Sequence, residues 1–179
     1  MLSVAFVGGP TGAWQVERVA AVVGRALPAV PRLEVVEGKE DLAGTPTWIL
    51  RGVTSNLRYT RQDEAVSLAA REEPLGRAPA TRAALIPITK SDAWWQLAQD
   101  ARREILEESS HHIAVGLEYL PAIARRLHHG RDLGAEFDFL TWFEYRPEDS
   151  DAFEDLVHRL RKTPEWTFIA REIDIRLSR

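Results

Sequence analysis

Residues 137–177 read FDFLTWFEYRPEDSDAFEDLVHRLRKTPEWTFIAREIDIRL and predict a strand, a helix and a second strand. Residues 137–145 form an apolar, aromatic run of strand length. A helix is expected over residues 151–162, with inward side chains at Phe153, Leu156, Val157 and Leu160. A long final strand is expected over residues 166–177, where alternation places on one face Ile169, Ile173, Ile175 and Leu177.

The preceding segments extend this alternation of strands and helices. Apolar runs of strand length lie at residues 2–7, 33–36, 47–53 and 83–89. Helices are expected at residues 13–27, at residues 61–72 and after a capping Ser91, where one face carries Trp94, Ala98, Ala101 and Ile105. The order favours an α+β fold of ferredoxin-like βαββαβ units, with an antiparallel sheet and helices outside it; a duplication of the unit is one reading of the pattern.

A boundary between two lobes is expected at residues 73–80, which contain two prolines and a glycine. We therefore place a shortened N-terminal ferredoxin-like lobe at residues 1–76 and a C-terminal ferredoxin-like lobe at residues 77–179.

The composition is that of an ordinary globular protein, since 45% of the 179 residues are hydrophobic and 28% are charged. A formal charge of −4 argues against a general nucleic-acid-binding protein, which needs a clustered basic surface. The absence of cysteine excludes disulfides, iron–sulfur clusters and thiolate-ligated haem. The N-terminal apolar run follows no basic region and is too short to span a bilayer, so we expect a cytoplasmic protein.

Two histidine doublets, His111-His112 and His128-His129, contain four of the five histidines. Three interpretations are possible. In the first, the histidines are core or surface residues. In the second, each doublet supplies one ligand of a zinc site that Asp138 or Glu118 completes. In the third reading one histidine is the axial ligand of a haem, which also needs a carboxylate behind the imidazole, apolar walls and nearby cations. Composition and spacing leave these readings open.

Four segments of the second half stand in a recognisable order: RAALIPITKSDAWWQLAQDARREI, SSHHIAVGLEYLPAIARRLHHGRDLG, FDFLTWFEY and TPEWTFIAREIDIRL. In this order and spacing, the chain from about residue 77 to its C-terminus resembles the chlorite dismutase family, and in particular its short, dimeric branch. The upstream segment LRGVTSNLRY adds to the resemblance. The family's fold is a dimeric α+β barrel, so the resemblance implies that architecture and a homodimer.

The resemblance also implies a haem b whose iron is bound by His112. In the family a distal arginine follows the proximal histidine by thirteen residues, and Arg125 keeps that interval from His112, whereas His111 reaches only Ala124. Arg125 is then the catalytic residue, and Glu165 holds the second ring nitrogen of His112. Other implied cofactor contacts are the proximal side and haem edge at Lys90, Trp94 and Trp95, a propionate at Tyr59, and the distal wall at Thr141 and Phe143.

The implied function is that of a haem b chlorite dismutase, which converts chlorite to chloride and dioxygen, with residues 77–179 as the haem-binding lobe. The alternatives are a coproheme decarboxylase-like enzyme, whose branch lacks the distal arginine, a peroxidase-like haem enzyme, or a non-catalytic haem-binding dimer. The expected partners are a small anion, chlorite, and a second copy of the chain, with no nucleic acid and no membrane.

Overall fold

The computed structural model describes residues 1–38, 44–54 and 58–179. In this part of the chain, eight antiparallel strands close into a barrel in the order β1-β3-β2-β8-β5-β7-β6-β4. The strands are β1 Ser3–Gly9, β2 Trp14–Val23, β3 Arg32–Glu37, β4 Trp48–Val53, β5 Arg82–Lys90, β6 Ala124–His129, β7 Phe139–Tyr145 and β8 Ile169–Ser178.

The barrel consists of two halves with the same strand order. The sequence β4-β1-β3-β2 in the first half and β8-β5-β7-β6 in the second both run fourth, first, third, second, which is the ferredoxin-like arrangement. The predicted α+β fold with an antiparallel sheet and ferredoxin-like units is therefore confirmed. The division into lobes at residues 76 and 77 stays a prediction, because the barrel joins both halves into one sheet.

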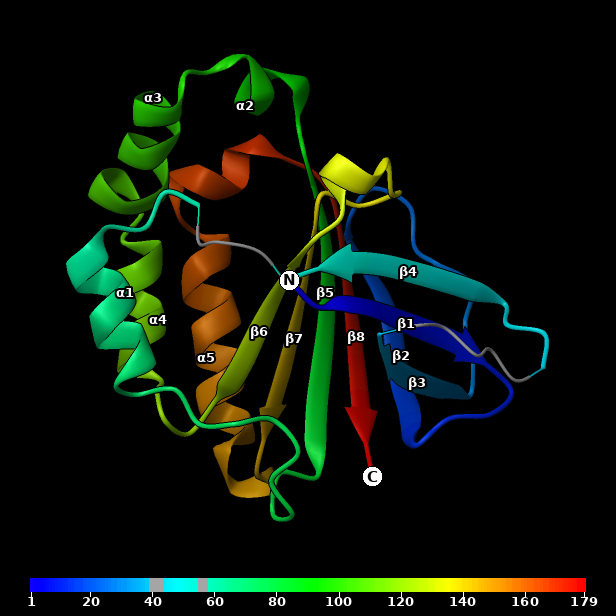
Figure 1. Cartoon of the computed structure of the whole chain (residues 1–179). Helices are drawn as coiled ribbons and strands as arrows, with labels where there is room; N and C mark the ends of the chain where they lie inside the picture. The colour runs from blue at the N-terminus through cyan, green and yellow to red at the C-terminus, as the bar shows by residue number, and fades with distance from the viewer. Residues whose placement is uncertain (39–43, 55–57) are drawn as a thin grey trace.

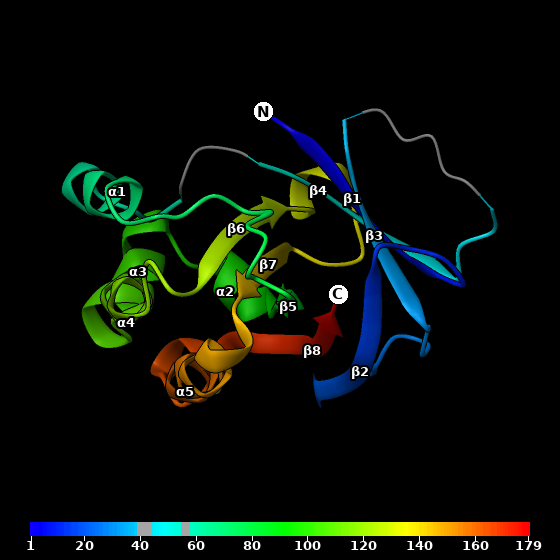
Figure 2. The same cartoon turned by 90° about the horizontal axis from the view of Figure 1, so that it is seen from below.

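The helices gather on the outer face of the second half, as Figures 1 and 2 show. They are α1 Gln62–Ala69, α2 Asp92–Gln96, α3 Gln99–Arg103, α4 His112–Glu118 and α5 Ser150–Arg161. A π-helical turn at Glu104–Ser109 joins α3 to the loop before α4, and short 3₁₀ turns lie at Arg131–Leu133, Pro147–Asp149 and Pro164–Phe168. Among the described residues, none of the helices has the length and apolarity needed to cross a membrane.

Alternation along the strands divides the apolar side chains between two cores. On β5, Ala83 and Leu85 point into the barrel, while Ile86 and Ile88 face the helices. The helix-side core contains all four side chains predicted to face inward from α5, namely Phe153, Leu156, Val157 and Leu160. On β8, Ile173, Ile175 and Leu177 share the barrel core as predicted. Ile169 packs in the helix-side core instead, because a register shift between β5 and β8 reverses its direction.

The helix predicted at residues 13–27 is wrong, because residues 14–23 form β2 and the rest of the segment is not helical. Pairing of β2 with β8 shifts register between Val16 and Arg18 and again between Ala21 and Val23. Each irregularity breaks the period of two, so the apolar residues of a bulged strand fall at spacings of three and four, as in a helix. The first half therefore has no helix between β1 and β2 in the described residues.

Two other predictions are corrected in part. The helix after Ser91 does not run through to residue 105, because Leu97 has an extended backbone that separates α2 from α3. The final strand begins at Ile169 rather than at residue 166, since Pro164–Phe168 forms a 3₁₀ turn with its proline in the first turn. Both α4 and β6 lie in the histidine-rich stretch, for which the apolar pattern alone predicts no element.

Candidate functional site

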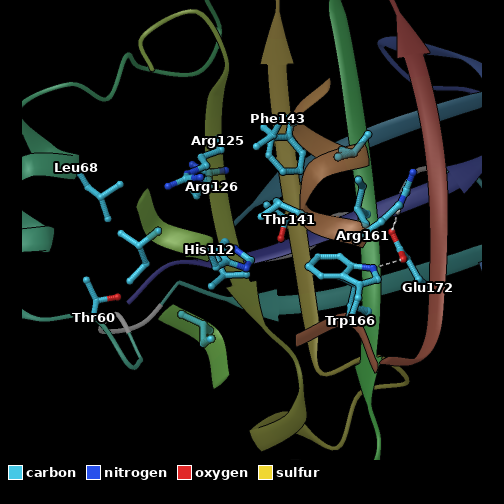
Figure 3. A pocket seen from close by; sticks show the side chains of 18 of the residues that line it. Thr60, Leu68, His112, Arg125, Arg126, Thr141, Phe143, Arg161, Trp166 and Glu172 are labelled. Atoms are coloured by element: carbon cyan, nitrogen blue, oxygen red, sulfur yellow. Dashed lines mark hydrogen bonds and ion pairs between the residues drawn. The ribbon is translucent and has the colours of Figure 1, made fainter. Parts of the chain in front are cut away.

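A cavity of about 430 Å³ lies between the second half of the barrel and its helices, and Figure 3 shows most of the side chains that line it. Its volume is that of a small-molecule site. The polar and aromatic part of its wall includes His112 from α4, Arg125 and His129 from β6, and Thr141 and Phe143 from β7. Apolar side chains from β5 and α5 complete much of the rest of the wall.

A buried carboxylate holds the imidazole of His112 from behind. The Nδ1 atom of His112 lies 2.6 Å from Oε2 of Glu165, and Oε1 of Glu165 accepts a 2.6 Å hydrogen bond from Nζ of Lys90. The side chains of Glu165 and Lys90 are each 4% exposed. Because an ionised carboxylate only accepts hydrogen bonds, the proton belongs on Nδ1, which leaves Nε2 with a lone pair that can bind a metal.

The negative charge of Glu165 persists despite its burial. Burial raises the pKa of this carboxyl, but the adjacent His112 and Lys90 outweigh burial and bring the pKa to about 2. Burial lowers the pKa of Lys90, and the attraction of Glu165 opposes that shift. The Lys90 ammonium also lies over the ring of Trp94, 4.3 Å from its centroid. A fixed charge behind the imidazole makes His112 a more basic ligand.

The orientation of His112 depends on how α4 begins. His111 precedes the helix with a φ of 53°, in the left-handed region, and His112 is the first helical residue. The carboxylate of Glu107, in the π-helical turn, accepts the backbone N–H groups of Ile113 at 2.6 Å and of Ala114 at 3.2 Å. These donors have no partner inside the helix, and a carboxylate there also favours the helix dipole. Glu107 thus anchors the turn that carries His112.

Trp166 supports the same imidazole from one side. Its ring stacks on that of His112, with centroids 6.2 Å apart and planes at 22°. Its Nε1 donates a 2.7 Å hydrogen bond to Glu172, which is fully buried and also accepts a 2.8 Å hydrogen bond from Nε of Arg161. Figure 3 shows this chain of contacts along the cavity wall. The pattern of apolar residues in the sequence does not identify Trp166 or Glu172 as residues of the site.

Arg125 presents an unneutralised cation to the cavity from β6. Within the described parts of the chain, its guanidinium has no hydrogen-bond or ion-pair partner. Burial lowers the pKa of Arg125, and the charge of Glu72 opposes this. Gly116, one turn after His112 on α4, makes room for the guanidinium, because a Cβ there would lie 2.2 Å from Nη1. A cation placed in this way can attract a small anion.

The other residues implied by the resemblance surround the network behind His112. Tyr59, with a φ of 61°, accepts a 3.2 Å hydrogen bond from Arg102, and its ring lies 6.0 Å from that of Trp94. Trp94 is 1% exposed, and its Nε1 has no partner among the described residues. Nε1 of Trp95 donates to Asp138 at 3.2 Å. Tyr59, Trp94 and Trp95 are not among the described residues that line the cavity. Their contacts with a cofactor therefore stay predictions.

The second histidine doublet divides between core and cavity. His128 is fully buried beside Phe6, and burial lowers its pKa to about 4. Its Nδ1 donates to the carbonyl oxygen of Leu140, whereas His129 faces the cavity. Asp138 and Glu118, the predicted partners of a zinc site, bind other groups. Over the described residues, no three side chains of His, Asp or Glu converge as metal ligands would.

Comparisons with known proteins agree with this geometry. A family model described as chlorite dismutase matches residues 39–179. A chlorite dismutase from Ideonella dechloratans is 34% identical over 125 residues, which are 68% of this chain and 41% of that protein. The chain therefore spans well under half the length of that relative.

Solved structures extend the match to the whole fold. A structure described as dimeric chlorite dismutases from Nitrobacter winogradskyi is 53% identical, with a TM-score of 0.92 over 98% of this chain and 99% of that chain. A mutant chlorite dismutase from Candidatus Nitrospira defluvii, in complex with cyanide, has the same fold at 18% identity, with a TM-score of 0.68 over 99% of this chain and 90% of that chain. The family model spans most of this chain, and the chain belongs to the chlorite dismutase family.

Proposed function

We propose that this protein binds haem b through Nε2 of His112 and converts chlorite to chloride and dioxygen, with Arg125 as the catalytic residue. The observation that carries the proposal is the buried contact of 2.6 Å between His112 and Glu165 on a cavity that Arg125 also lines. Family membership supports the reaction, because relatives with this fold are described as chlorite dismutases.

The donor set fits a haem. A haem needs one neutral imidazole with its far nitrogen held, and His112 has this arrangement with Glu165. It also needs apolar walls, which β5 and α5 supply, and hydrogen-bond donors at its edge. We propose Nε1 of Trp94 as such a donor, because it is buried without a partner among the described residues, although Trp94 itself does not line the cavity. Lys90, Tyr59 and Trp95 complete the proposed cofactor contacts, and Thr141 and Phe143 the distal wall.

The residues of this chain would divide the work as follows. Haem iron, when bound, supplies the oxygen-transfer chemistry. Glu165 keeps the proton on Nδ1 of His112, and Lys90 keeps Glu165 ionised. Arg125 attracts chlorite electrostatically and retains the anion near the reacting centre until dioxygen forms. The apolar walls exclude water, which strengthens the pull of Arg125 on an anion.

We also propose that the protein is a homodimer, as the relative from Nitrobacter winogradskyi is described as dimeric. Residues 77–179 act as the haem-binding lobe in this proposal, because most of the cavity wall comes from them. The cytoplasmic location stays a prediction.

The decisive experiment measures dioxygen release on an oxygen electrode when chlorite is added to haem-reconstituted protein, with an absorption spectrum of the same sample. Rapid release from a high-spin ferric haem would support both a haem iron with an open coordination position and the chlorite reaction. A Soret band without dioxygen would contradict the chlorite reaction and favour a decarboxylase, a peroxidase or a carrier. No Soret band would contradict haem binding itself.

A further inference from the structure

His129 lines the cavity, and the proposed reaction gives it no role. It ends β6, where alternation places it on the same face as Leu127 and Arg125. The residue is only 3% exposed, and its ring meets that of Phe139 edge to face, with centroids 5.5 Å apart. The imidazole is therefore fixed in the wall of the cavity.

The Nδ1 atom of His129 is buried and, among the described residues, has no hydrogen-bond partner. The adjacent His128 shows the contrast, because its Nδ1 donates to Leu140 and its Nε2 accepts from Arg126, both at 3.0 Å. Buried polar atoms are nearly always paired, so an unpaired one requires an explanation. An unpaired imidazole nitrogen on a residue that borders a cavity indicates a group that binds there.

The surroundings of His129 define the chemistry of that group. Burial and the positive charge of Arg58 lower the pKa of His129, while Asp132, the ion-pair partner of Arg58, opposes them. The imidazole is therefore neutral near pH 7 and has one N–H to donate. An N–H donor with a guanidinium nearby suits a carboxylate. The adjoining Phe139 stacks on Trp95 with centroids 6.1 Å apart, which provides an apolar surface beside the polar group.

We propose that His129 donates a hydrogen bond to a peripheral carboxylate of the bound tetrapyrrole, with Arg58 supplying the positive charge nearby. This inference rests on the haem binding proposed above and adds a binding residue to it. The role is one of binding: His129 distinguishes a ring with free carboxylates from one in which they are blocked.

The test compares the affinity of the full chain for iron protoporphyrin IX and for its dimethyl ester, in which both carboxylates are blocked. Quenching of tryptophan fluorescence reports binding without any turnover. His129→Phe keeps an aromatic ring against Phe139 and removes the donor, and His129→Gln restores a donor. His158→Phe, on the exposed face of α5, is the control.

We expect His129→Phe to weaken binding of the diacid by about tenfold, as loss of a hydrogen bond to a charged group would, and to leave binding of the diester within about twofold. His129→Gln should recover part of the loss, and His158→Phe should change neither affinity. An equal loss for both ligands, or no loss for either, would overturn the inference and leave the proposed function standing. Equal losses would assign His129 to packing, and no loss would show that the carboxylates do not depend on His129. If the unaltered protein bound neither ligand, the haem proposal and this inference would fail together.

Discussion

The Nδ1 atom of His112 and Oε2 of Glu165 lie 2.6 Å apart, although the two residues are 53 positions apart in the chain. Glu165 lies in the 3₁₀ turn before β8, and His112 opens α4 before β6, so the contact joins the segments that precede the two outer strands of the second half. The carboxylate determines which ring nitrogen of His112 carries the proton, and thereby which one can bind iron.

Substitution of the two histidines of the first doublet should have opposite results. His112→Ala should abolish or strongly weaken haem binding, because it removes the nitrogen directed by Glu165. His111→Ala should retain haem, since His111 contributes its backbone to the start of α4. Titration of both variants with haem, followed at the Soret band, measures the difference. Retention of haem by His112→Ala and its loss in His111→Ala would refute the assignment.

Glu165→Gln should lower the free energy of unfolding at neutral pH by about 3–5 kcal/mol, because it leaves the buried ammonium of Lys90 without its counter-charge. The folded-state pKa of Glu165 lies below its usual 4.5, at about 2, so its charge stabilises the fold above pH 4.5. That stabilisation is lost as the pH falls from about 4.5 to 2.

Urea unfolding of both proteins at pH 7, 5 and 3 checks this pH dependence. The difference in free energy between wild type and Glu165→Gln should be largest at pH 7 and 5 and smaller at pH 3. Glu118→Gln is the matched control, since its ion pair with Arg159 is exposed to solvent and should contribute little to the free energy of unfolding. A difference between wild type and Glu165→Gln that is the same at every pH would argue against the charged pair.

Glu107→Gln tests the anchor of α4. The amide presents one acceptor instead of a carboxylate, so we expect a loss of about 1–2 kcal/mol in the free energy of unfolding and weaker haem binding. The neighbouring Glu108 is exposed and pairs with Arg61, so Glu108→Gln should change both quantities little. Chemical denaturation and haem titration of the two variants measure the contrast. Equal effects would show that Glu107 does not position His112.

Arg125→Ala should bind haem but release dioxygen at least tenfold more slowly, because the cation that retains the anion is gone. It should also inactivate earlier and yield more hypochlorite in a trapping assay. Arg126→Ala is the control: Arg126 also lines the cavity, but its guanidinium is already held by a hydrogen bond to His128 and an ion pair with Glu37. Unchanged turnover and lifetime in Arg125→Ala would reject the proposed role.

Gly116→Ala should separate stability from turnover. Alanine favours a helix by about 0.5–1 kcal/mol over glycine, and the group it would meet is the movable end of Arg125, so the fold should not lose stability. The guanidinium would have to shift from its present place, and dioxygen release should fall. Calorimetry and the oxygen electrode measure the two effects. A loss of stability with normal turnover would contradict the role of Gly116.

Much of the fold was predictable because its signals are local. The apolar residues of β7, α5 and most of β8 repeat with the period of their element, and these segments form as expected. The segment of β2 was mistaken for a helix because its bulges depend on pairing with β8, which lies about 150 residues away in the chain. The spacing of the apolar residues in this segment does not indicate that it pairs with β8.

The sequence by itself determined the α+β class, and its resemblance to a known family selected His112, Arg125 and Glu165. Only the tertiary structure decided what surrounds them: the cap that Glu107 places on α4, and the Trp166–Glu172 contact beside the imidazole. Only the structure shows that Nδ1 of His129 has no hydrogen-bond partner among the described residues. The physical reason is range. Periodicity reports contacts within one element, whereas hydrogen bonds in the site join groups that approach only when the barrel closes.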